Sequence, residues 1–308
     1  MEYDLIVVGA GPAAFGCAIY AVRYNLKTLV IGSIGESQAS KASVIQNYPG
    51  FNKVQGLELL EKFKEHAESF GTVVKEDEVK RLEKEKNLFK VTTQNNVYFS
   101  KTLLISTGTK RRTLNIPGEK EFLNKGVTYC AVCDGPFFKD KTVSVVGGSD
   151  AAASTALLLT EYASKVFIIY RKDKLRAKPY LVEKIKKNPK IEVIYNANVV
   201  EAYGGKFLEG VKLDTGKDVK TDGLFIEIGS VPLSDLARDL GVEFNPDGSI
   251  KVNNNQETNV EGVYAAGDVT KSSDAFRQVL VAAAEGSRAA NRIYLYLLHT
   301  KGSASQWV

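Results

Sequence analysis

The chain of 308 residues contains only three cysteines and two histidines. Three cysteines are too few for the disulfide framework that stabilises small secreted domains. A structural zinc site normally needs four ligands, and His66 and His299 lie far along the chain from Cys130 and Cys133. This scarcity argues against a secreted scaffold and against a structural zinc site.

Blocks of like charge and membrane-spanning runs are also lacking. The net charge is +5, and Lys and Arg are spread along the chain, so nothing points to nucleic acid as a partner. The uncharged stretch from Leu5 to Val22 follows acidic residues and is interrupted by Gly9, Gly11 and Pro12, unlike a signal peptide or a membrane helix. We expect a cytoplasmic protein that does not enter a membrane.

Two segments of the chain repeat one pattern of strand, glycine-containing loop, helix and strand. The span from Gly9 to Ile31 is as long as the span from Gly147 to Ile169. The expected strands and loops are strand 5–8, loop GAGPAA at 9–14 and strand 28–31 in the first copy, and strand 143–146, loop GGSDAA at 147–152 and strand 166–169 in the second.

Each repeat has the pattern of a dinucleotide-binding unit. The first glycine permits the tight turn out of the strand, the second lets a pyrophosphate approach the backbone, and the third small residue lets the helix pack closely. The helix N-terminus then faces the phosphates. Two such units, in a chain longer than one core usually serves, predict an α/β fold with two Rossmann-like, three-layer domains. Two nucleotide sites suit a flavin and a nicotinamide.

The two loops differ at the middle position. The first loop, with Gly9, Gly11 and Ala14, matches the pattern fully. The second has Ser149 where a glycine is usual, which places a side chain on the expected path of the phosphates. The second loop therefore has two interpretations, a nucleotide site or a structural turn left by duplication.

The residues that follow the second strand of each repeat indicate which nicotinamide nucleotide would bind. An NAD site usually has an acidic residue there, but this chain has Gly32 and Tyr170. Arg171 and Lys172 follow Tyr170, with Arg176 further on. Such a basic cluster suits the extra phosphate of NADP. The alternative is an ordinary solvated basic loop.

Cys130 and Cys133 form a C-x-x-C pair, and Asp134 follows at once. This spacing lets one thiolate be stabilised while the other resolves a mixed disulfide, so we interpret the pair as a redox-active dithiol. A buried, unreactive pair is the alternative. Asp134 is a candidate acid or base for the thiols, or else a turn residue. Cys17, on the first expected helix, is predicted to be a packed apolar residue.

The segment CAVCDG at 130–135 resembles the redox centre of the low-molecular-weight thioredoxin reductases, the class II FAD-dependent pyridine nucleotide-disulfide oxidoreductases. The likeness covers nearly the whole chain. Its further motifs are GAGPAAFGCAIYAVR from Gly9, NYPGF from Asn47, STGTKRRTLNIPGE from Ser106, EIGSVP from Glu227, YAAGDVT from Tyr264 and FRQVLVAAAEG from Phe276.

The resemblance implies two sets of binding residues. The expected FAD contacts are Gly9, Gly11, Pro12, Ala13, Gly32, Gln38, Asn47, Thr107, Gly108, Gly267, Asp268, Arg277, Gln278 and Val279. The expected NADPH contacts are Gly147, Ser149, Asp150, Ala151, Arg171, Lys172, Arg176, Ile228 and Gly229. The chain departs from the family at Ser149, at Lys172, and at Ser154 and Thr155, where the family usually has two acidic residues.

The resemblance also implies the domain organisation. Residues 1–111 and 239–308 would form a discontinuous FAD domain, and residues 112–238 would form an inserted pyridine-nucleotide domain with the cysteines. Members of the family are homodimers whose small domain rotates, with a hinge expected near 109–112 and 230–233.

By resemblance, electrons would pass from NAD(P)H through FAD to Cys133, which lies nearer the flavin. Cys130 would then attack the disulfide of a thioredoxin- or glutaredoxin-like partner, while Asp134 supplies or takes the thiol proton. Three alternatives stay open. The donor could be reduced ferredoxin or another flavin, the flavin could react with oxygen as in an NAD(P)H oxidase, or the dithiol could serve a non-catalytic redox sensor.

Overall fold

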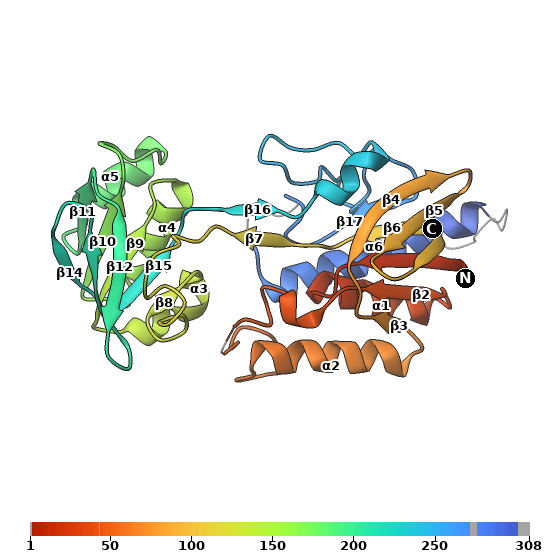
Figure 1. The fold of residues 1–308 in the computed structure, drawn as a ribbon, viewed down its shortest axis with the longest axis horizontal. Coiled ribbons are helices and arrows are strands. Elements are labelled where there is room, and N and C mark those ends of the chain that lie inside the picture. The colour runs from red at the N-terminus through yellow and green to blue at the C-terminus, as the bar shows by residue number, and fades with distance from the viewer. Residues whose placement is uncertain (1, 43, 272–275, 301–308) are drawn as a thin grey trace. The chain divides into compact units, whose positions relative to one another are not determined.

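The computed structural model describes residues 2–42, 44–271 and 276–300. The chain divides into two compact units, Met1–Lys110 with Val231–Val308, and Arg111–Ser230 (Figure 1). The return to the first unit therefore comes earlier in the chain than the boundary expected between 238 and 239. The 3-10 helix η3 (Asp235–Leu240) explains the difference, because its residue Ala237 is fully buried in the core of the first unit.

The first unit is built on a seven-stranded sheet. The strand order is β3-β2-β1-β6-β5-β4, and β17 pairs with β6. The bounds are β1 Glu2–Val8, β2 Thr28–Ile31, β3 Val73–Lys75, β4 Val79–Glu85, β5 Leu88–Thr93, β6 Val97–Ile105 and β17 Val263–Ala265. Parallel pairing joins β3 to β2, β2 to β1, β1 to β6 and β6 to β17. Antiparallel pairing joins β6 to β5 and β5 to β4. Parallel strands buried on both faces read as continuous apolar runs, as the predicted segments 5–8 and 28–31 do.

Helices α1 (Pro12–Arg23) and α6 (Val279–Thr300) pack closely against each other beside this sheet (Figure 1). Their backbones come so close that a Cβ at Gly16 would lie 2.3 Å from the carbonyl oxygen of Ala283. A Cβ at Gly286 would lie 2.0 Å from the carbonyl oxygen of Ala13. Two glycines thus permit this helix contact. The remaining helices of the unit are η1 (Ile34–Glu36) and α2 (Gly56–Ser69).

The second unit has three layers, as predicted. Its parallel sheet has the order β11-β10-β9-β15-β8, and a separate antiparallel sheet has the order β12-β13-β14. The strands are β8 Val127–Thr128, β9 Thr142–Val146, β10 Lys165–Tyr170, β11 Ile191–Tyr195, β12 Val199–Gly204, β13 Leu208–Leu213, β14 Asp218–Lys220 and β15 Gly223–Ile226. The helices are α3 Ala131–Asp134, η2 Gly135–Phe138, α4 Asp150–Leu159 and α5 Pro179–Lys187.

Alternation along β10 explains the layers of the second unit. Val166 and Ile168 join the apolar cluster that contains residues of α4 and α5, whereas Ile169 joins the cluster that contains residues of β12–β14. Successive side chains of a strand point to opposite faces, so one sheet can carry helices on one side and a second sheet on the other.

The chain enters and leaves the second unit through two strands that pair with each other, β7 (Thr109–Arg111) and β16 (Ser230–Pro232). The amide N–H of Arg112 donates to the carbonyl oxygen of Gly229 at 3.0 Å. These strands coincide with the two expected crossings.

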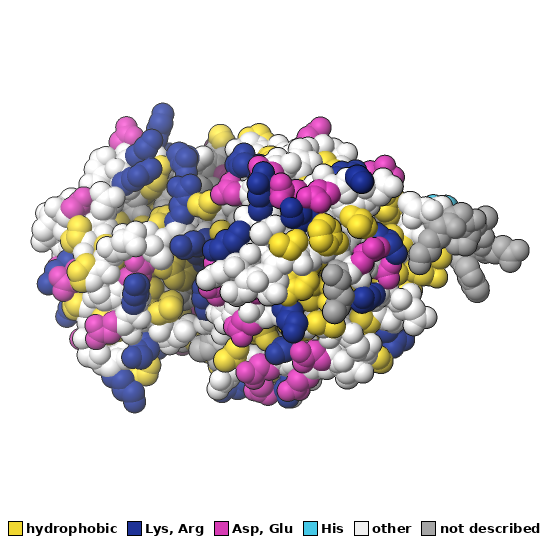
Figure 2. Space-filling model, turned by 45° about the vertical axis from the view of Figure 1, so that its right-hand side comes forward, with side chains coloured by type: hydrophobic (Ala, Val, Ile, Leu, Met, Phe, Trp, Pro, Cys, Tyr) yellow, Lys and Arg dark blue, Asp and Glu magenta, His cyan; other side chains and the backbone are white. Residues whose placement is uncertain are grey.

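Two features of the surface bear on partners. On the face drawn in Figure 2, Lys and Arg side chains are scattered and interspersed with Asp and Glu side chains. Over the described part of the chain, no helix combines the length and the apolar character needed to cross a membrane.

The α1–α6 contact yields a prediction. Alanine is a better helix former than glycine by about 1 kcal/mol, yet we expect Gly286→Ala to lower the free energy of unfolding by about 1–3 kcal/mol. The reason is the overlap of the new Cβ with the Ala13 carbonyl oxygen. Urea unfolding followed by circular dichroism measures the change. Ala284 is exposed on the same helix, and Ala284→Ser should change stability by less than about 0.5 kcal/mol.

Candidate active site

The first glycine loop joins β1 to α1 and lies against the end of β6. Gly9 has φ +111°, and a Cβ there would lie 2.5 Å from the carbonyl oxygen of Ser106. Gly32, after β2, approaches the same loop, since its Cβ would lie 3.0 Å from the amide nitrogen of Ala10. Gly9, Gly32 and Ser106, which precedes Thr107, therefore lie close together. They stand at the carboxyl ends of three parallel strands, where α/β sheets bind ligands.

The start of α1 can receive an anion. Gly11 is the N-cap residue of α1, and because glycine has no side chain, no side chain caps the N–H groups of the first turn. The first turn also contains no acidic residue. Among the described residues, a Cβ at Gly11 would meet only the hydroxyl oxygen of Ser37, at 3.4 Å, so the backbone is open to a close approach. These features fit the pyrophosphate of FAD.

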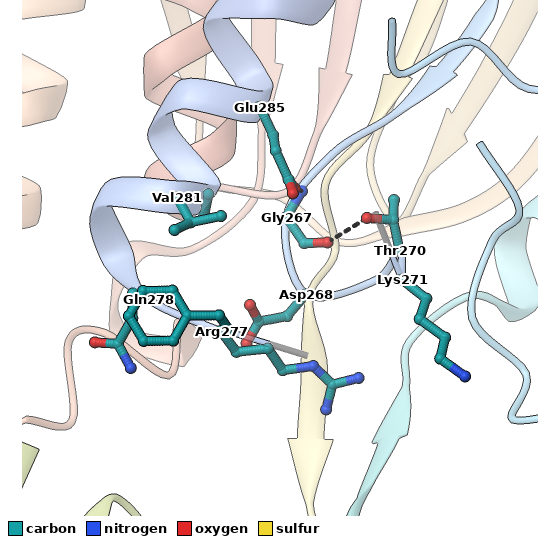
Figure 3. Close-up of a pocket in the computed structure, with 10 residues that line it drawn as sticks. Gly267, Asp268, Thr270, Lys271, Arg277, Gln278, Val281 and Glu285 are labelled. Atoms are coloured by element: carbon teal, nitrogen blue, oxygen red, sulfur yellow. Dashed lines mark hydrogen bonds between the residues drawn. The ribbon is translucent and has the colours of Figure 1, made fainter. Parts of the chain in front are cut away.

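The segment after β17 supplies a second wall. Gly267 lies against the start of α1, because its Cβ would sit 3.0 Å from the Ala13 Cβ. Its amide N–H donates to Glu285 Oε2 at 2.7 Å. Figure 3 shows Asp268, Arg277 and Gln278 around the pocket that begins at this turn. The predicted residues of the GD turn and of the start of α6 are therefore neighbours.

Other expected FAD residues have contacts within the first unit. Asn47 donates from Nδ2 to Gln278 Oε1 at 3.0 Å, which joins two predicted segments. Thr107 Oγ1 donates to the carbonyl oxygen of Leu233 at 2.5 Å, and Gly108 accepts from the amide of Leu233 at 3.0 Å. These two residues thus bind the returning chain. Gln38 is half-buried beside Ser37, and Val279 begins α6.

Cys130 and Cys133 form a disulfide with their Cα atoms 5.3 Å apart. Cys130 is the N-cap residue of α3, and its Sγ accepts the amide N–H of Cys133 at 3.2 Å. The amide N–H of Cys130 donates to Thr128 Oγ1 at 3.2 Å. A hydrogen bond to sulfur favours the charged form of a thiol, so this arrangement stabilises a thiolate on Cys130 after reduction.

Asp134 is tied to the same turn. Its amide N–H donates to the carbonyl oxygen of Cys130 at 3.0 Å, and its carboxylate accepts a hydrogen bond from the Thr128 hydroxyl. Burial raises the pKa of Asp134, while the Thr128 hydrogen bond and the charge of Arg111 oppose that rise. The carboxyl group therefore holds its proton to higher pH than an exposed aspartate does, as an acid beside a dithiol requires.

The second glycine loop joins β9 to α4. Gly147 has φ +149°, and a Cβ there would lie 2.4 Å from the carbonyl oxygen of Glu227. At Gly148 a Cβ would overlap the ring of Tyr170, so this tyrosine packs on the loop. Ser149 is the N-cap residue of α4, and its side chain makes no capping hydrogen bond.

The basic cluster lies beside this second loop. The amide N–H of Arg176 donates to the carbonyl oxygen of Gly148 at 2.7 Å, and the amide of Lys178 donates to the Asp150 carboxylate at 2.7 Å. The side chains of Arg171, Lys172 and Arg176 are exposed. Cations next to an uncapped helix start fit a phosphate-bearing dinucleotide, with Ser149 as the departure from the usual glycine.

The remaining predicted residues of the second site lie around this loop. Ala151 is in the first turn of α4, and Ile228 and Gly229 follow β15. Sequence reasoning missed Glu285, Glu227 and Arg111. An acidic residue inside the alanine-rich stretch VLVAAAEG was a signal for Glu285, but its partner Gly267 is visible only in the fold.

Cys17 has the predicted role of a packed apolar residue, and the histidine near the C-terminus is exposed. Cys17 is fully buried in the first core, and burial raises the pKa of its thiol. His299 is exposed near the end of α6.

Comparison with known proteins identifies the family. A family model described as pyridine nucleotide-disulphide oxidoreductase matches residues 3–286. The thioredoxin reductase of Bacillus subtilis (strain 168) is 40% identical over 302 residues, which cover 96% of this chain and 95% of that protein. The crystal structure of the thioredoxin reductase of Streptococcus pyogenes MGAS5005 superimposes with a TM-score of 0.91 at 34% identity, covering 97% of this chain and 99% of that one.

A ferredoxin-flavin thioredoxin reductase of Clostridium acetobutylicum has a TM-score of 0.52 at 34% identity and covers 97% of this chain and 99% of that chain. The fold and the disulfide place the chain among FAD-dependent disulfide oxidoreductases. It belongs to the pyridine nucleotide-disulphide oxidoreductases and, within them, to the low-molecular-weight thioredoxin reductases.

The burial of the cysteines predicts their accessibility. In the reduced native protein we expect iodoacetamide to alkylate two thiols, Cys130 and Cys133, because Cys17 is fully buried. Cys17 should react only after denaturant is added. Mass spectrometry of the labelled peptides measures the sites, and rapid native labelling of Cys17 would contradict the assignment.

Proposed function

We propose that this enzyme reduces the disulfide of a thioredoxin- or glutaredoxin-like protein with electrons from NADPH. The observation that carries the proposal is the Cys130–Cys133 disulfide with Asp134 hydrogen-bonded into the same turn. The thioredoxin reductases that cover nearly the whole chain support it.

We assign FAD to the first unit and NADPH to the second. Gly9, Gly11, Gly32, Asp268 and the start of α6 would hold FAD, which when bound supplies the electron pair for the disulfide. Arg171, Lys172 and Arg176 would hold the extra phosphate of NADPH, the electron donor. The uncapped start of α1 and the exposed cations beside Gly148 support these assignments.

The chain's own residues account for the exchange. Two electrons and two protons convert the disulfide into two thiols. The Cys130 thiolate, favoured by the Cys133 N–H, attacks one sulfur of the partner's disulfide, and the leaving thiolate takes a proton from Asp134. The Asp134 carboxylate then takes the Cys133 proton, and the Cys133 thiolate attacks Cys130 Sγ, which restores the internal disulfide. The second leaving thiolate of the partner takes up the proton that Cys130 released to the solvent, so the partner leaves as a dithiol.

Two further assignments belong to this proposal. We propose a homodimer, as in the family that the chain resembles, and sedimentation equilibrium measures the mass. We also propose a cytoplasmic location, because the cytosol is a reducing environment in which a dithiol protein partner stays reduced.

Replacement of the cysteines tests the reaction. Cys133→Ser should lower thioredoxin reduction by at least about a thousandfold, because the mixed disulfide cannot be resolved from within the enzyme. The variant should still purify with its flavin and should form a mixed disulfide with thioredoxin on a non-reducing gel, whereas Cys130→Ser should not. Cys17→Ala is the control with normal turnover. Full activity of Cys133→Ser would refute the assignment.

Replacement of the basic cluster tests the donor. Arg176→Ala should raise the KM for NADPH by about tenfold or more and leave the KM for NADH unchanged, because a charge-assisted bond to the extra phosphate is lost. Lys174→Ala removes an exposed charge from the same segment and serves as the control. Steady-state kinetics with both nucleotides measures the split.

A second donor has one specific observation in its favour, the Ser149 side chain at the start of α4. In an anaerobic titration NADPH should bleach the flavin absorbance. Bleaching by reduced ferredoxin, with none by NADPH or NADH, would assign the donor to ferredoxin instead. Rapid oxygen consumption without thioredoxin reduction would identify an oxidase.

A further inference from the structure

Arg111, the first residue of the second unit, contacts the main chain directly before the redox disulfide. Its guanidinium donates a hydrogen bond to the carbonyl oxygen of Tyr129, the residue that precedes Cys130. The guanidinium carbon also lies 5.6 Å from the centre of the Tyr129 ring, within the range of a cation–π contact. One side chain therefore holds both the backbone and the ring of this residue.

Tyr129 is held at its other end by a buried acid. Its hydroxyl donates to Glu119 Oε1, and Glu119 is only 4% exposed. The Glu119 carboxylate also accepts the amide N–H groups of Leu114 at 3.0 Å and of Asn115 at 2.7 Å. Two main-chain hydrogen bonds fix Glu119, and Glu119 in turn fixes the hydroxyl of Tyr129. Arg111 therefore binds a residue that is itself held in place.

The same guanidinium acts on two half-buried carboxyl groups. Burial raises the pKa of Asp134 and of Glu227, and the positive charge of Arg111 lowers both. Each carboxylate also accepts one hydroxyl, Asp134 from Thr128 and Glu227 from Thr155, the latter at 3.1 Å. Arg111 is thus the cation shared by the acid beside the dithiol and by the acid that follows β15.

The other titratable groups around Asp134 come from the elements packed against α3. Among the described residues they include Cys130 at the N-cap of α3, Cys133 within α3, Tyr129 after β8, and Tyr162 after α4, whose ring would lie 3.3 Å from a Cβ at Gly135. Asp150, at the opposite end of α4, is engaged by the amide of Lys178. Segment η2 (Gly135–Phe138) contains no titratable residue.

We propose that Arg111 is a positioning residue of the disulfide exchange: it anchors the main chain before Cys130 and places one positive charge beside Asp134. The inference rests on the proposed function for its effect on turnover. It assigns a role to a residue whose guanidinium acts through the main chain of Tyr129.

The sign of the effect follows from the exchange step. Asp134 can protonate the partner's leaving thiolate only while it holds a proton, so turnover falls as the pH rises through its pKa. Arg111 lowers that pKa, so removal of Arg111 should move the alkaline limb to higher pH. Because the guanidinium binds the carbonyl oxygen of the residue before Cys130, we expect the same charge to favour the Cys130 thiolate. Its removal should then also raise the pH at which Cys130 becomes reactive.

The experiment compares three variants of the flavin-loaded, full-length enzyme. For Arg111→Met we expect the alkaline midpoint of kcat/KM for thioredoxin to rise by about one pH unit. Arg111→Lys keeps the charge and should keep the midpoint near that of the unsubstituted enzyme. Arg112→Met removes the neighbouring exposed charge and should leave the midpoint in place.

A second readout needs neither an electron donor nor thioredoxin. The rate of iodoacetamide modification of Cys130 in the reduced protein, followed against pH by mass spectrometry, should show a midpoint raised in Arg111→Met alone. A raised alkylation midpoint with no thioredoxin reduction by any variant would sink the proposed function and keep the role of Arg111. Unchanged midpoints in Arg111→Met, with a native circular dichroism spectrum, would overturn the role itself.

Discussion

The first unit depends on the close approach of α1 to α6, which two glycines make possible. Gly16 and Gly286 let each helix lie against a carbonyl oxygen of the other. Because α6 is held at this depth, Glu285 reaches the amide of Gly267 and fixes the turn that begins with Asp268. The glycine loop before α1, the turn after β17 and the start of α6 are therefore parts of one packed arrangement. The glycine loop offers backbone groups to the nucleotide, so its fit depends on this rigid packing.

Local patterns in the sequence were enough to predict both strand–loop–helix units. Their strands are mostly apolar runs, and their loops need glycine at a particular φ, so each signal lies within a few residues. The segment 28–31 agrees with β2 end to end, and 143–146 lies within β9. The disulfide was predictable for the same reason, since both of its cysteines and Asp134 are neighbours in the chain.

Contacts between distant segments could not be predicted in this way. Arg111 meets Tyr129, and Glu285 meets Gly267, only after the chain has folded, and neither pair has a characteristic spacing. Glu227 was read as part of a crossing motif, but its carboxylate faces Thr155 on α4. The boundary between the two units lies at Ser230 and Val231, within the expected hinge at 230–233. The expected domain bounds ran on to 238, because the apolar residues of η3 give no sign in the sequence of which core they join.

The pairing of β7 with β16 has a consequence for how such a protein can arise and be rebuilt. The insert begins and ends at neighbouring positions, joined by the hydrogen bond between Arg112 and Gly229. A module whose two ends meet can be added to a host loop, or exchanged for another, without stretching the host chain. The second unit, which carries the dithiol, could in this respect be exchanged for another domain while the first unit keeps its own fold.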